Sequence, residues 1–201
     1  MPASSKARER AEEWDGMYSG GKQPFGPLPF PKIDTLLTEH CHKAGDVLDI
    51  GAGYGRDAIY LAKEHKCRVT AVDPAPEGIK AIEVAAQTHG LAIKGQCAFI
   101  EDYQFGTGVH DMVLMDSVLS FVDEDVQPRA VKAALQSLRS GGHLVVIGWP
   151  NEAEVGWVGR LIGEAAVGAV VTKDAEVIDT HASFGGEEMQ MTWHVTVARA
   201  A

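Results

Sequence analysis

The sequence is short of cysteine, and its three cysteines indicate neither a disulfide framework nor a metal site. Cys41, Cys67 and Cys97 are odd in number and show no C-x-x-C spacing, whereas both kinds of site need paired or closely spaced thiols. We interpret them as buried thiols. The triplet His-Cys-His at 40–42 resembles a ligand cluster. Neighbouring side chains on a helix end point in different directions, however, so we expect no bound metal.

Positive charge and long apolar runs are also scarce. The chain has 18 Lys and Arg against 28 Asp and Glu, a formal net charge of −10, and no basic stripe. Because such a surface repels nucleic acid, we expect a small-molecule partner instead. No stretch approaches the roughly 18 to 20 apolar residues that span a bilayer, and residues 1–18 are charged, unlike a signal peptide. We expect a soluble cytoplasmic protein without a membrane partner, either a monomer or a homodimer.

The hydrophobic pattern predicts the fold class. Short apolar runs alternate with helical patterns, which is typical of strand-helix-strand units around a parallel sheet. Strands are predicted at 46–50, 68–72, 96–100, 112–116, 143–149, 176–181 and 189–198, with a helix at 155–171 and another that ends at Ser140-Gly141-Gly142. The last strand alternates apolar and polar residues. We expect an α/β fold with a Rossmann-like, doubly wound, mixed seven-stranded sheet, mostly parallel with an antiparallel C-terminal strand.

The N-terminal segment differs from the rest of the chain in its sequence pattern. Residues 4–18 are predicted to form a helix, and 23–31 carry four prolines, which favour stiff extended structure. Trp14, Tyr18 and Phe25 give this segment a large aromatic surface. We therefore divide the chain into a lid, 1–31, and a main domain, 32–201. The alternative is a segment that packs on the outside of the core or stays mobile.

The most informative stretch for function is 47–57, an apolar strand that runs into Gly51, Gly53 and Gly55. Glycines after a strand let the backbone approach a nucleotide, and an acid about 20 positions later, here Asp73, can hold ribose hydroxyls. Dinucleotide sites use G-x-G-x-x-G, but here the third glycine comes one residue early and Arg56 takes its place. The pattern therefore predicts a nucleoside cofactor of another class.

The position of Asp49 also helps to distinguish which class of nucleoside cofactor the site would bind. A carboxylate two residues before the first glycine would repel a pyrophosphate but suits a ligand that carries an ammonium and a sulfonium. At this point the sequence resembles the class I S-adenosylmethionine-dependent methyltransferases. Segments 47–62, 72–74, 111–121 and 138–148 look like successive motifs of that superfamily, in order. Within that superfamily, the sequence is most similar to the small tellurite-resistance and thiol-type methyltransferases.

The resemblance implies S-adenosylmethionine as the cofactor and assigns roles to individual residues. The methionine end of the cofactor would contact Asp49, Gly51, Ala52, Gly53, Tyr54, Gly55 and Arg56. The ribose would contact Asp73 and Pro74, and the adenine would contact Glu101, Asp102 and Tyr103. The transferable methyl group would lie beside Asp116, Ser117 and Val118. For Glu101 and Asp102 a solvated loop is the alternative, and for Asp116 a helix cap. Trp14, Tyr18, Phe25, Phe121 and Trp149 would form the lid and the acceptor pocket.

The acceptor decides whether a base is needed. A thiolate needs none, whereas a hydroxyl or an ammonium must lose a proton, and His181 is the candidate for this role. The tellurite-type enzymes carry a His-Arg pair in this region, but Ala182 follows here, so the arginines that would hold an oxyanion are missing. Even so, we expect methyl transfer to a small molecule, with a thiol, metalloid oxyanion or similar soft nucleophile favoured.

Three alternatives remain open. One is O- or N-methylation of a small metabolite. The second is a nicotinamide-dependent oxidoreductase, against which the early third glycine and Arg56 argue. The third is a non-catalytic cofactor-binding protein that keeps the fold without the acceptor site.

Overall fold

The computed structural model describes residues 3–27, 29, 33–35, 45–148, 158, 160–162, 170–184 and 187–200, with backbone only for 170–184 and 187–194. The elements are α1 (Ser5–Tyr18), η1 (Ser19–Gly21), β1 (Asp46–Ile50), α3 (Arg56–Glu64), β2 (Arg68–Asp73), α4 (Pro76–His89), β3 (Ile93–Cys97), β4 (His110–Asp116), η2 (Leu119–Phe121), α5 (Gln127–Ser137), β5 (Leu138–Gly148), β6 (Val170–Phe184) and β7 (Glu187–Arg199).

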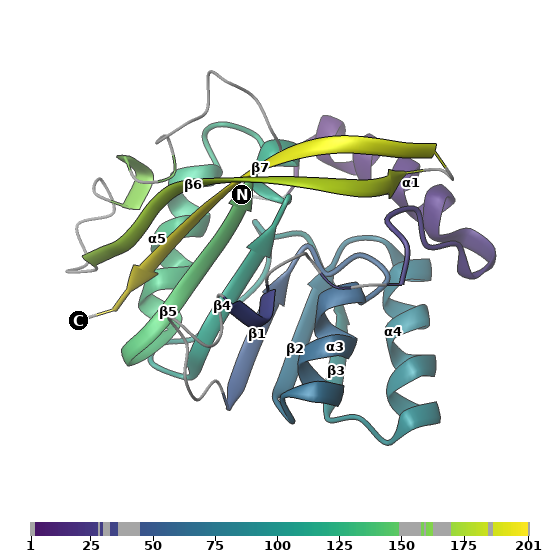
Figure 1. Cartoon of the computed structure of the whole chain (residues 1–201), viewed down its shortest axis with the longest axis horizontal. Coiled ribbons are helices and arrows are strands. Elements are labelled where there is room, and N and C mark those ends of the chain that lie inside the picture. The colour runs from purple at the N-terminus through teal and green to yellow at the C-terminus, as the bar shows by residue number, and fades with distance from the viewer. Residues whose placement is uncertain are drawn as a thin grey trace.

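The strands form one sheet in the order β3-β2-β1-β4-β5-β7-β6 (Figure 1). Strands β1 to β5 pair in parallel, whereas β7 is antiparallel to both β5 and β6. This confirms a Rossmann-like α/β fold with a mostly parallel sheet and antiparallel pairing at its C-terminal end. The strand order reverses between β1 and β4, and in such sheets ligands bind beyond the carboxyl ends of the strands at that reversal.

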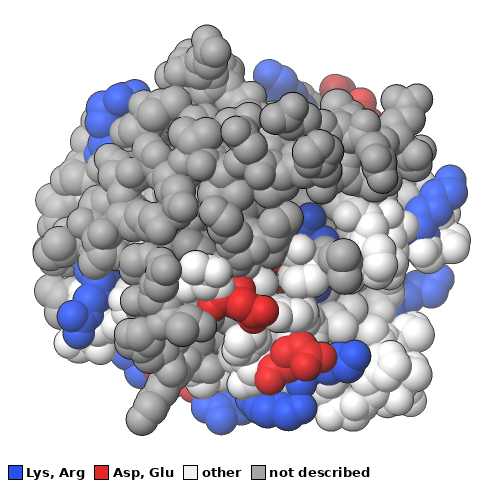
Figure 2. Space-filling view, in the orientation of Figure 1, with Lys and Arg blue, Asp and Glu red and all other residues white. Residues whose placement is uncertain are grey.

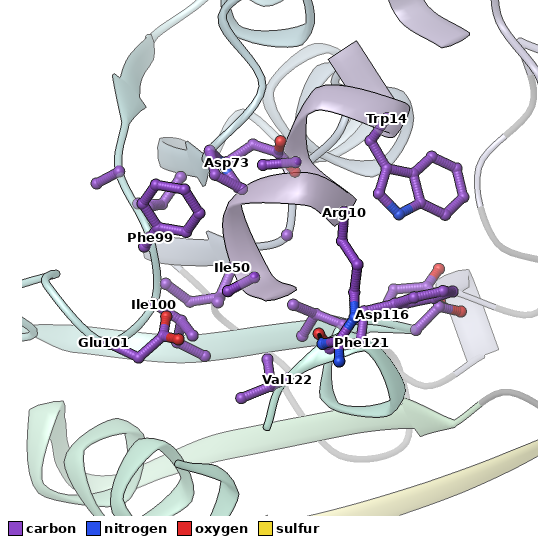
Figure 3. A pocket seen from close by; sticks show the side chains of 18 of the residues that line it. Arg10, Trp14, Ile50, Asp73, Phe99, Ile100, Glu101, Asp116, Phe121 and Val122 are labelled. Carbon is purple, nitrogen blue, oxygen red and sulfur yellow. Dashed lines mark hydrogen bonds between the residues drawn. The ribbon is translucent and has the colours of Figure 1, made fainter. Parts of the chain in front are cut away.

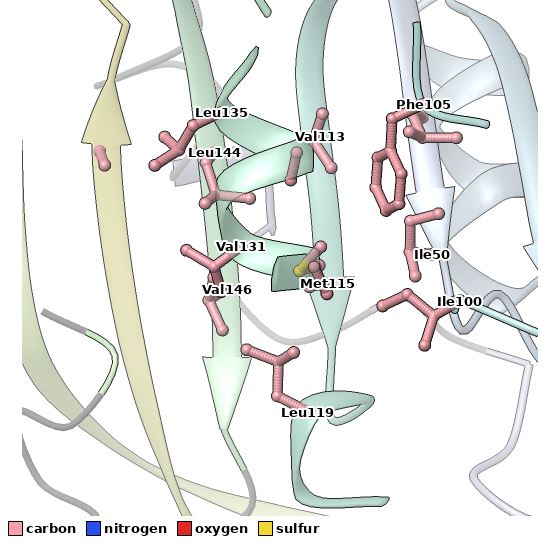
Figure 4. Close-up of a cluster of buried hydrophobic side chains, with 14 of the residues drawn as sticks. Ile50, Ile100, Phe105, Val113, Met115, Leu119, Val131, Leu135, Leu144 and Val146 are labelled. Carbon is pink, nitrogen blue, oxygen red and sulfur yellow. The ribbon is translucent and has the colours of Figure 1, made fainter. Parts of the chain in front are cut away.

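Helices cover both faces of the sheet, and alternate strand residues supply the two cores. In β4, Met112 and Leu114 pack in the cluster that contains residues of α3 and α4. Val113 and Met115 pack in the other cluster, against Val131 and other residues of α5 (Figure 4). A strand buried on both faces is apolar throughout, which is why the sequence shows short continuous runs here.

Helices α1 and α4 show local sequence signals for helix initiation or termination. Ser4 caps α1, its hydroxyl accepting a 3.0 Å hydrogen bond from the backbone N–H of Ala7. Helix α4 begins with Pro76 and ends at Gly90, whose φ of 63° is the left-handed conformation common at helix ends. The predicted helix over 4–18 is confirmed.

Several predicted boundaries are wrong. Strand β3 ends at Cys97 rather than at residue 100, so that 98–100 form the loop after it. Helix α5 stops at Ser137, and the residues predicted to close it belong to β5, at a register shift against β4. The predicted helix over 155–171 overlaps the start of β6, and most of it lies outside the described residues.

The thiols differ from one another. Cys67 is buried as predicted, but Cys97 is exposed because β3 is the edge strand. The triplet 40–42 lies outside the described residues. Within the described part of the chain, no helix is both long and apolar enough to cross a membrane. On the face shown in Figure 2, the Lys and Arg side chains lie in separate groups rather than in one basic stripe.

Candidate active site

The turn after β1 is built on glycines whose backbone conformation and close neighbours disfavour any larger residue. Gly51 and Gly53 have φ of 75° and 56°, which disfavours a side chain. A Cβ on Gly51 would lie 2.6 Å from the Cβ of Val118, and one on Gly53 would lie 2.9 Å from the hydroxyl of Tyr18. The turn is therefore held between the end of β4 and helix α1, and it lines one of the cavities described below.

Gly55 has a different role from the one the sequence suggested. Its φ is 90°, and a Cβ there would lie 2.5 Å from Cγ1 of Ile82. Gly55 does not line either of the cavities described below, so it serves the packing of α3 on α4. Gly78 acts similarly, because its Cβ would lie 2.5 Å from the carbonyl oxygen of Gly53. Sequence reasoning missed Gly78, although a glycine inside a helix pattern is a signal of close packing.

Asp73, at the end of β2, fastens the turn. One carboxylate oxygen accepts a 2.9 Å hydrogen bond from the backbone N–H of Gly53, and the other accepts one of 2.9 Å from that of Ala75. Burial raises the pKa of Asp73 to about 6, against the opposing effect of these two hydrogen bonds. Two of its four lone-pair positions are thus in use and two remain for a ligand.

Three carboxylates and one guanidinium gather at the start of α3. Arg56 pairs with Asp57 at 3.0 Å and also with Asp116 at the end of β4. Asp49 is buried, and its Oδ2 atom has no hydrogen-bond partner. Burial, with Asp57 and Asp116 nearby, raises the pKa of Asp49 well above its ordinary value. A buried carboxyl oxygen without a partner is costly, so Oδ2 of Asp49 is suited to accept a hydrogen bond from a ligand.

Two adjoining cavities open at this edge of the sheet. The first, of about 140 Å³, is mainly apolar and is drawn in Figure 3. Helix α1 crosses this cavity. Phe99, Ile100 and Glu101 lie on one side of the helix, and the Arg10 side chain extends from the helix toward Phe121 on the other side. The second is lined by the glycine turn and the carboxylate cluster. Tyr18, Phe25, Gly51, Asp116 and Ser117 line both cavities, so the two meet at these residues.

Aromatic side chains close the first cavity. The Trp14 ring lies 5.8 Å from that of Tyr18, 5.9 Å from that of Phe25 and, edge on, 5.3 Å from that of Phe121. The predicted aromatic cluster of the N-terminal segment thus packs on the site rather than elsewhere on the core. Burial raises the pKa of the Tyr18 phenol, which therefore stays neutral.

The N-terminal helix is fixed to both sides of the site. Near its start, Ser4 donates a 2.6 Å hydrogen bond to Asp123, and Arg10 pairs with the same carboxylate at 3.2 Å while donating to the carbonyl of Phe121. Near its end, Asp15 accepts a 2.7 Å hydrogen bond from the backbone N–H of Glu77 in α4. These contacts hold α1 across the carboxyl ends of the strands.

Ser117 adopts a conformation that is unusual for its residue type. Its φ is 58°, its backbone N–H donates a 2.7 Å hydrogen bond to Ile147, and its hydroxyl donates one of 2.8 Å to Asp116. Left-handed backbone in residues other than glycine is uncommon and gathers at functional sites. Here it turns the chain sharply between β4 and η2, next to Asp116.

The central part of the chain matches a known family. Residues 47–142 match the family described as "Methyltransferase domain". Among curated proteins, the chain is 28% identical over 134 residues to a sarcosine/dimethylglycine N-methyltransferase of Halorhodospira halochloris, covering 65% of this chain and 47% of that protein. The chain spans about half the length of that relative.

Solved structures share the fold of this chain. The chain resembles the Burkholderia thailandensis 1,6-didemethyltoxoflavin-N1-methyltransferase with bound 1,6-didemethyltoxoflavin and S-adenosylhomocysteine, with a TM-score of 0.73 and 18% identity over 100% of this chain and 92% of that one. It also resembles TehB from Haemophilus influenzae, with a TM-score of 0.66 and 16% identity over 93% and 67% of the two chains. At these identities the likeness shows the fold alone.

Most of the predicted site residues come together at the two cavities. The described lining of the two cavities includes Trp14, Tyr18, Phe25, Asp49, Gly51, Ala52, Gly53, Tyr54, Arg56, Asp73, Pro74, Glu101, Asp116, Ser117, Val118 and Phe121. Asp102 and Tyr103 are not among them, because Asp102 is exposed and the Tyr103 ring packs edge on against Phe105 at 5.1 Å. Arg56, expected at the cofactor carboxylate, is paired with two protein carboxylates instead.

Two of the predicted site residues lie partly or wholly outside the part of the chain that the structure describes. Trp149 falls outside the described residues. The backbone of His181 lies in β6, paired with Gln190, and its side chain is not described. The register pairs Gly148, the last residue of β5, with His194, so that His181 lies farther along, at the edge of the sheet where the cavities open.

Sequence reasoning missed several lining residues. Arg10 and Ala11 share a helix face with Trp14 and Tyr18, and spacings of three and four residues were the available signal. Phe99 and Ile100 were assigned to a strand, so their loop position was not foreseen. Asp57 follows Arg56 directly, and only the folded chain shows that both belong to one charge cluster.

Proposed function

We propose that this chain transfers a methyl group from S-adenosylmethionine to a small-molecule acceptor. The observation that carries the proposal is the meeting of an apolar cavity with a carboxylate-lined cavity at the glycine turn, at the reversal of the strand order. A ligand with an apolar, aromatic end and a cationic end suits both cavities at once. The matched family and the carboxylate two residues before the first glycine support the same cofactor.

The residues present fit that cofactor. The glycine turn leaves room along its backbone, since added Cβ atoms would collide with Val118 or Tyr18. The unpartnered Oδ2 of Asp49 offers an acceptor for an ammonium, and the free lone pairs of Asp73 offer one for hydroxyl groups. Pro74, Phe99, Ile100 and Glu101 would surround the base. Asp102 and Tyr103, which the resemblance placed near the base, are not part of this arrangement.

The chain's own part in the reaction is positioning and exclusion of water. S-Adenosylmethionine supplies a methyl group on a sulfonium, and its leaving group needs no proton. Helix α1, with Trp14 and Phe25, covers the cavities and keeps water out, a condition that strengthens electrostatic effects at the site. We therefore retain the division into a lid, 1–31, and a main domain, 32–201, as part of the proposal. Trp149 and His181 stay predictions for the acceptor side.

The identity of the acceptor is a separate question from the fold. A thiol or metalloid oxyanion was favoured from the sequence, by a narrower resemblance to tellurite-resistance methyltransferases. For that resemblance, TehB is the relevant structural neighbour, and its likeness reaches only the fold. The names of other similar proteins mention N-methylation. Acceptors with nitrogen, oxygen and sulfur nucleophiles therefore all belong in the first activity screen.

Binding of S-adenosylhomocysteine tests the proposal directly. Asp73→Ala should weaken it by about 1 to 3 kcal/mol, the scale of lost charge-assisted hydrogen bonds, as measured by calorimetry. Asp125→Ala is the matched control, because Asp125 is exposed and pairs with Arg129 on the surface of the chain. Absence of binding to the wild-type protein would refute the proposal. Binding of NADPH in a fluorescence titration would favour the oxidoreductase alternative.

A further inference from the structure

Asp116 lies where the two cavities meet. It ends β4, lines both cavities, and has only 8% of its side chain exposed. Its Oδ2 pairs with Arg56 and its Oδ1 accepts the hydrogen bond of Ser117. The Asp57 side chain also contacts Asp116, and because an ionised carboxylate has about four lone-pair positions, Asp116 keeps capacity for a ligand. Arg56 and Ser117 hold it in place without using up its capacity.

The site as a whole is anionic and aromatic. Among the described residues that line the cavities, the carboxyl groups are Asp49, Asp57, Asp73, Glu101 and Asp116, and the guanidinium groups are Arg10 and Arg56. Both guanidiniums are already committed, Arg10 to Asp123 and the Phe121 carbonyl, Arg56 to Asp57 and Asp116. An anionic acceptor would meet repulsion here, whereas a cationic one would be attracted.

The aromatic wall favours the same kind of acceptor. Trp14, Phe25 and Phe121 form a connected group of rings beside Asp116 on the wall of the first cavity. Rings attract ammonium groups through their faces, and methylated ammonium groups are bound in this way. A carboxylate next to aromatic rings is thus matched to a nitrogen cation both before and after methylation.

We propose that the methyl acceptor is a primary or secondary amine, and that Asp116 binds its ammonium form and takes its proton. This inference rests on the proposed function. The N–H bond of the ammonium breaks and its proton moves to a carboxylate oxygen of Asp116, leaving a neutral amine. The nitrogen lone pair forms the new N–C bond as the C–S bond breaks, and sulfur keeps that electron pair. The products are a methylated ammonium and a neutral thioether, and Asp116 returns its proton to solvent.

The surroundings of Asp116 suit this role. The groups that face it are Arg56 and Asp57 from α3, Asp49 from β1, Tyr54 from the glycine turn and the neighbouring Ser117. Burial raises the pKa of Asp116, against the opposing effect of Arg56. A carboxylate whose pKa is ordinary is a weak base toward an ammonium. The raised pKa of Asp116 narrows the difference between its pKa and that of the ammonium, which makes the proton transfer easier.

The first experiment compares acceptors. The wild-type protein, with labelled S-adenosylmethionine, is given matched pairs of an amine and the thiol of the same carbon skeleton, across aliphatic, aromatic and carboxylate-bearing skeletons, together with tellurite. We expect methylated amines, with kcat/KM at least tenfold above that of the paired thiols. Preferred methylation of thiols or tellurite, or of no amine in the panel, overturns the inference. If the protein fails to bind S-adenosylhomocysteine at all, the proposed function fails first.

The second experiment tests Asp116. In Asp116→Asn, turnover of the best amine at saturating S-adenosylmethionine should fall by about 100-fold. The loss should shrink as the pH rises toward 10, where the amine loses its proton to solvent; a purely structural role predicts no such rescue. Asp125→Asn, a surface carboxylate, is the matched control. Unchanged turnover in Asp116→Asn, or a loss without rescue at high pH, contradicts the assignment.

A binding measurement keeps the inference testable if Asp116→Asn folds poorly. The best amine and the alcohol of the same skeleton are titrated into wild-type protein saturated with S-adenosylhomocysteine, at neutral pH. Because Asp116 attracts the ammonium, the amine should bind at least tenfold more tightly than the alcohol. Equal affinities overturn the inference. The same result would leave cofactor binding, and therefore the proposed function, intact.

Discussion

Asp15 of α1 accepts a 2.7 Å hydrogen bond from the backbone N–H of Glu77, in the first turn of α4. Ala75, which precedes that helix, provides no side-chain cap. Asp15 therefore performs the work of an N-cap from a distant part of the sequence, and its charge also favours the positive end of the helix. This contact ties the N-terminal helix to the helix that follows Asp73.

Removing this cap should loosen α1. Asp15→Ala is expected to lower the free energy of unfolding by about 1 kcal/mol and to weaken S-adenosylhomocysteine binding, because α1 covers the cavities. Asp15→Asn should keep most of both, since asparagine is an equally good cap. Urea unfolding and calorimetry measure the two effects. Identical behaviour of the alanine and asparagine variants would show that the hydrogen bond contributes little.

Gly78 should not tolerate even a methyl group. In Gly78→Ala the Cβ would lie 2.5 Å from the Gly53 carbonyl oxygen. Relief of this clash requires a shift of the backbone, because the oxygen belongs to the main chain. We expect unfolding to become easier by about 1 to 3 kcal/mol, with weaker cofactor binding because the turn is displaced. Gly16→Ala is the control in α1, where a Cβ meets nothing within 4 Å. It should raise stability by up to about 1 kcal/mol and leave affinity unchanged.

Cofactor affinity should depend on the protonation of Asp73. Burial raises the pKa of this carboxyl to about 6, so it is ionised above pH 6 and protonated below. Since the ionised form accepts hydrogen bonds from hydroxyl groups, S-adenosylhomocysteine affinity should be full above pH 6 and fall as the pH is lowered through it. Calorimetry between pH 5 and 8 measures this. Asp73→Asn, which cannot ionise, should lose that part of the pH dependence.

Trp14 should control how long the cofactor stays bound. Its ring contacts Tyr18, Phe25 and Phe121, and Trp14→Ala removes all three contacts. We expect a loss of about 2 kcal/mol in unfolding free energy and faster release of S-adenosylhomocysteine in stopped-flow measurements. Trp14→Phe should show a smaller change in both. Unaltered release from Trp14→Ala would contradict the proposed lid.

The sequence allowed prediction of those features that depend on local pattern. Strand β1 begins and ends as predicted, because Val47 to Ile50 form an apolar run followed at once by glycines. Strand β3 was misplaced, because an edge strand with Lys94 and Gln96 lacks the apolar run that marks a buried one. The loop after it, with Phe99, was misassigned for the same reason.

Charge clusters were harder to foresee than the glycine turn. Asp49, Arg56 and Asp116 were each singled out as candidates, but their gathering in one cluster depends on β1, α3 and β4 meeting at one sheet edge. Arg56 was expected to face a ligand carboxylate, and the structure pairs it with Asp57 and Asp116 because unpaired buried charges are costly. Cys97 was expected to be buried, and its exposure follows from the edge position of β3.

The sequence alone determined the glycine turn, the acidic residues after β1 and β2, and the alternation of strands and helices, since each depends on spacing within a short segment. Only the tertiary structure decided that α1 crosses the site, that Asp15 caps α4, and that Asp116 stands between two cavities. Those relations join residues far apart in the chain, and their energies come from packing and burial, which local sequence does not specify.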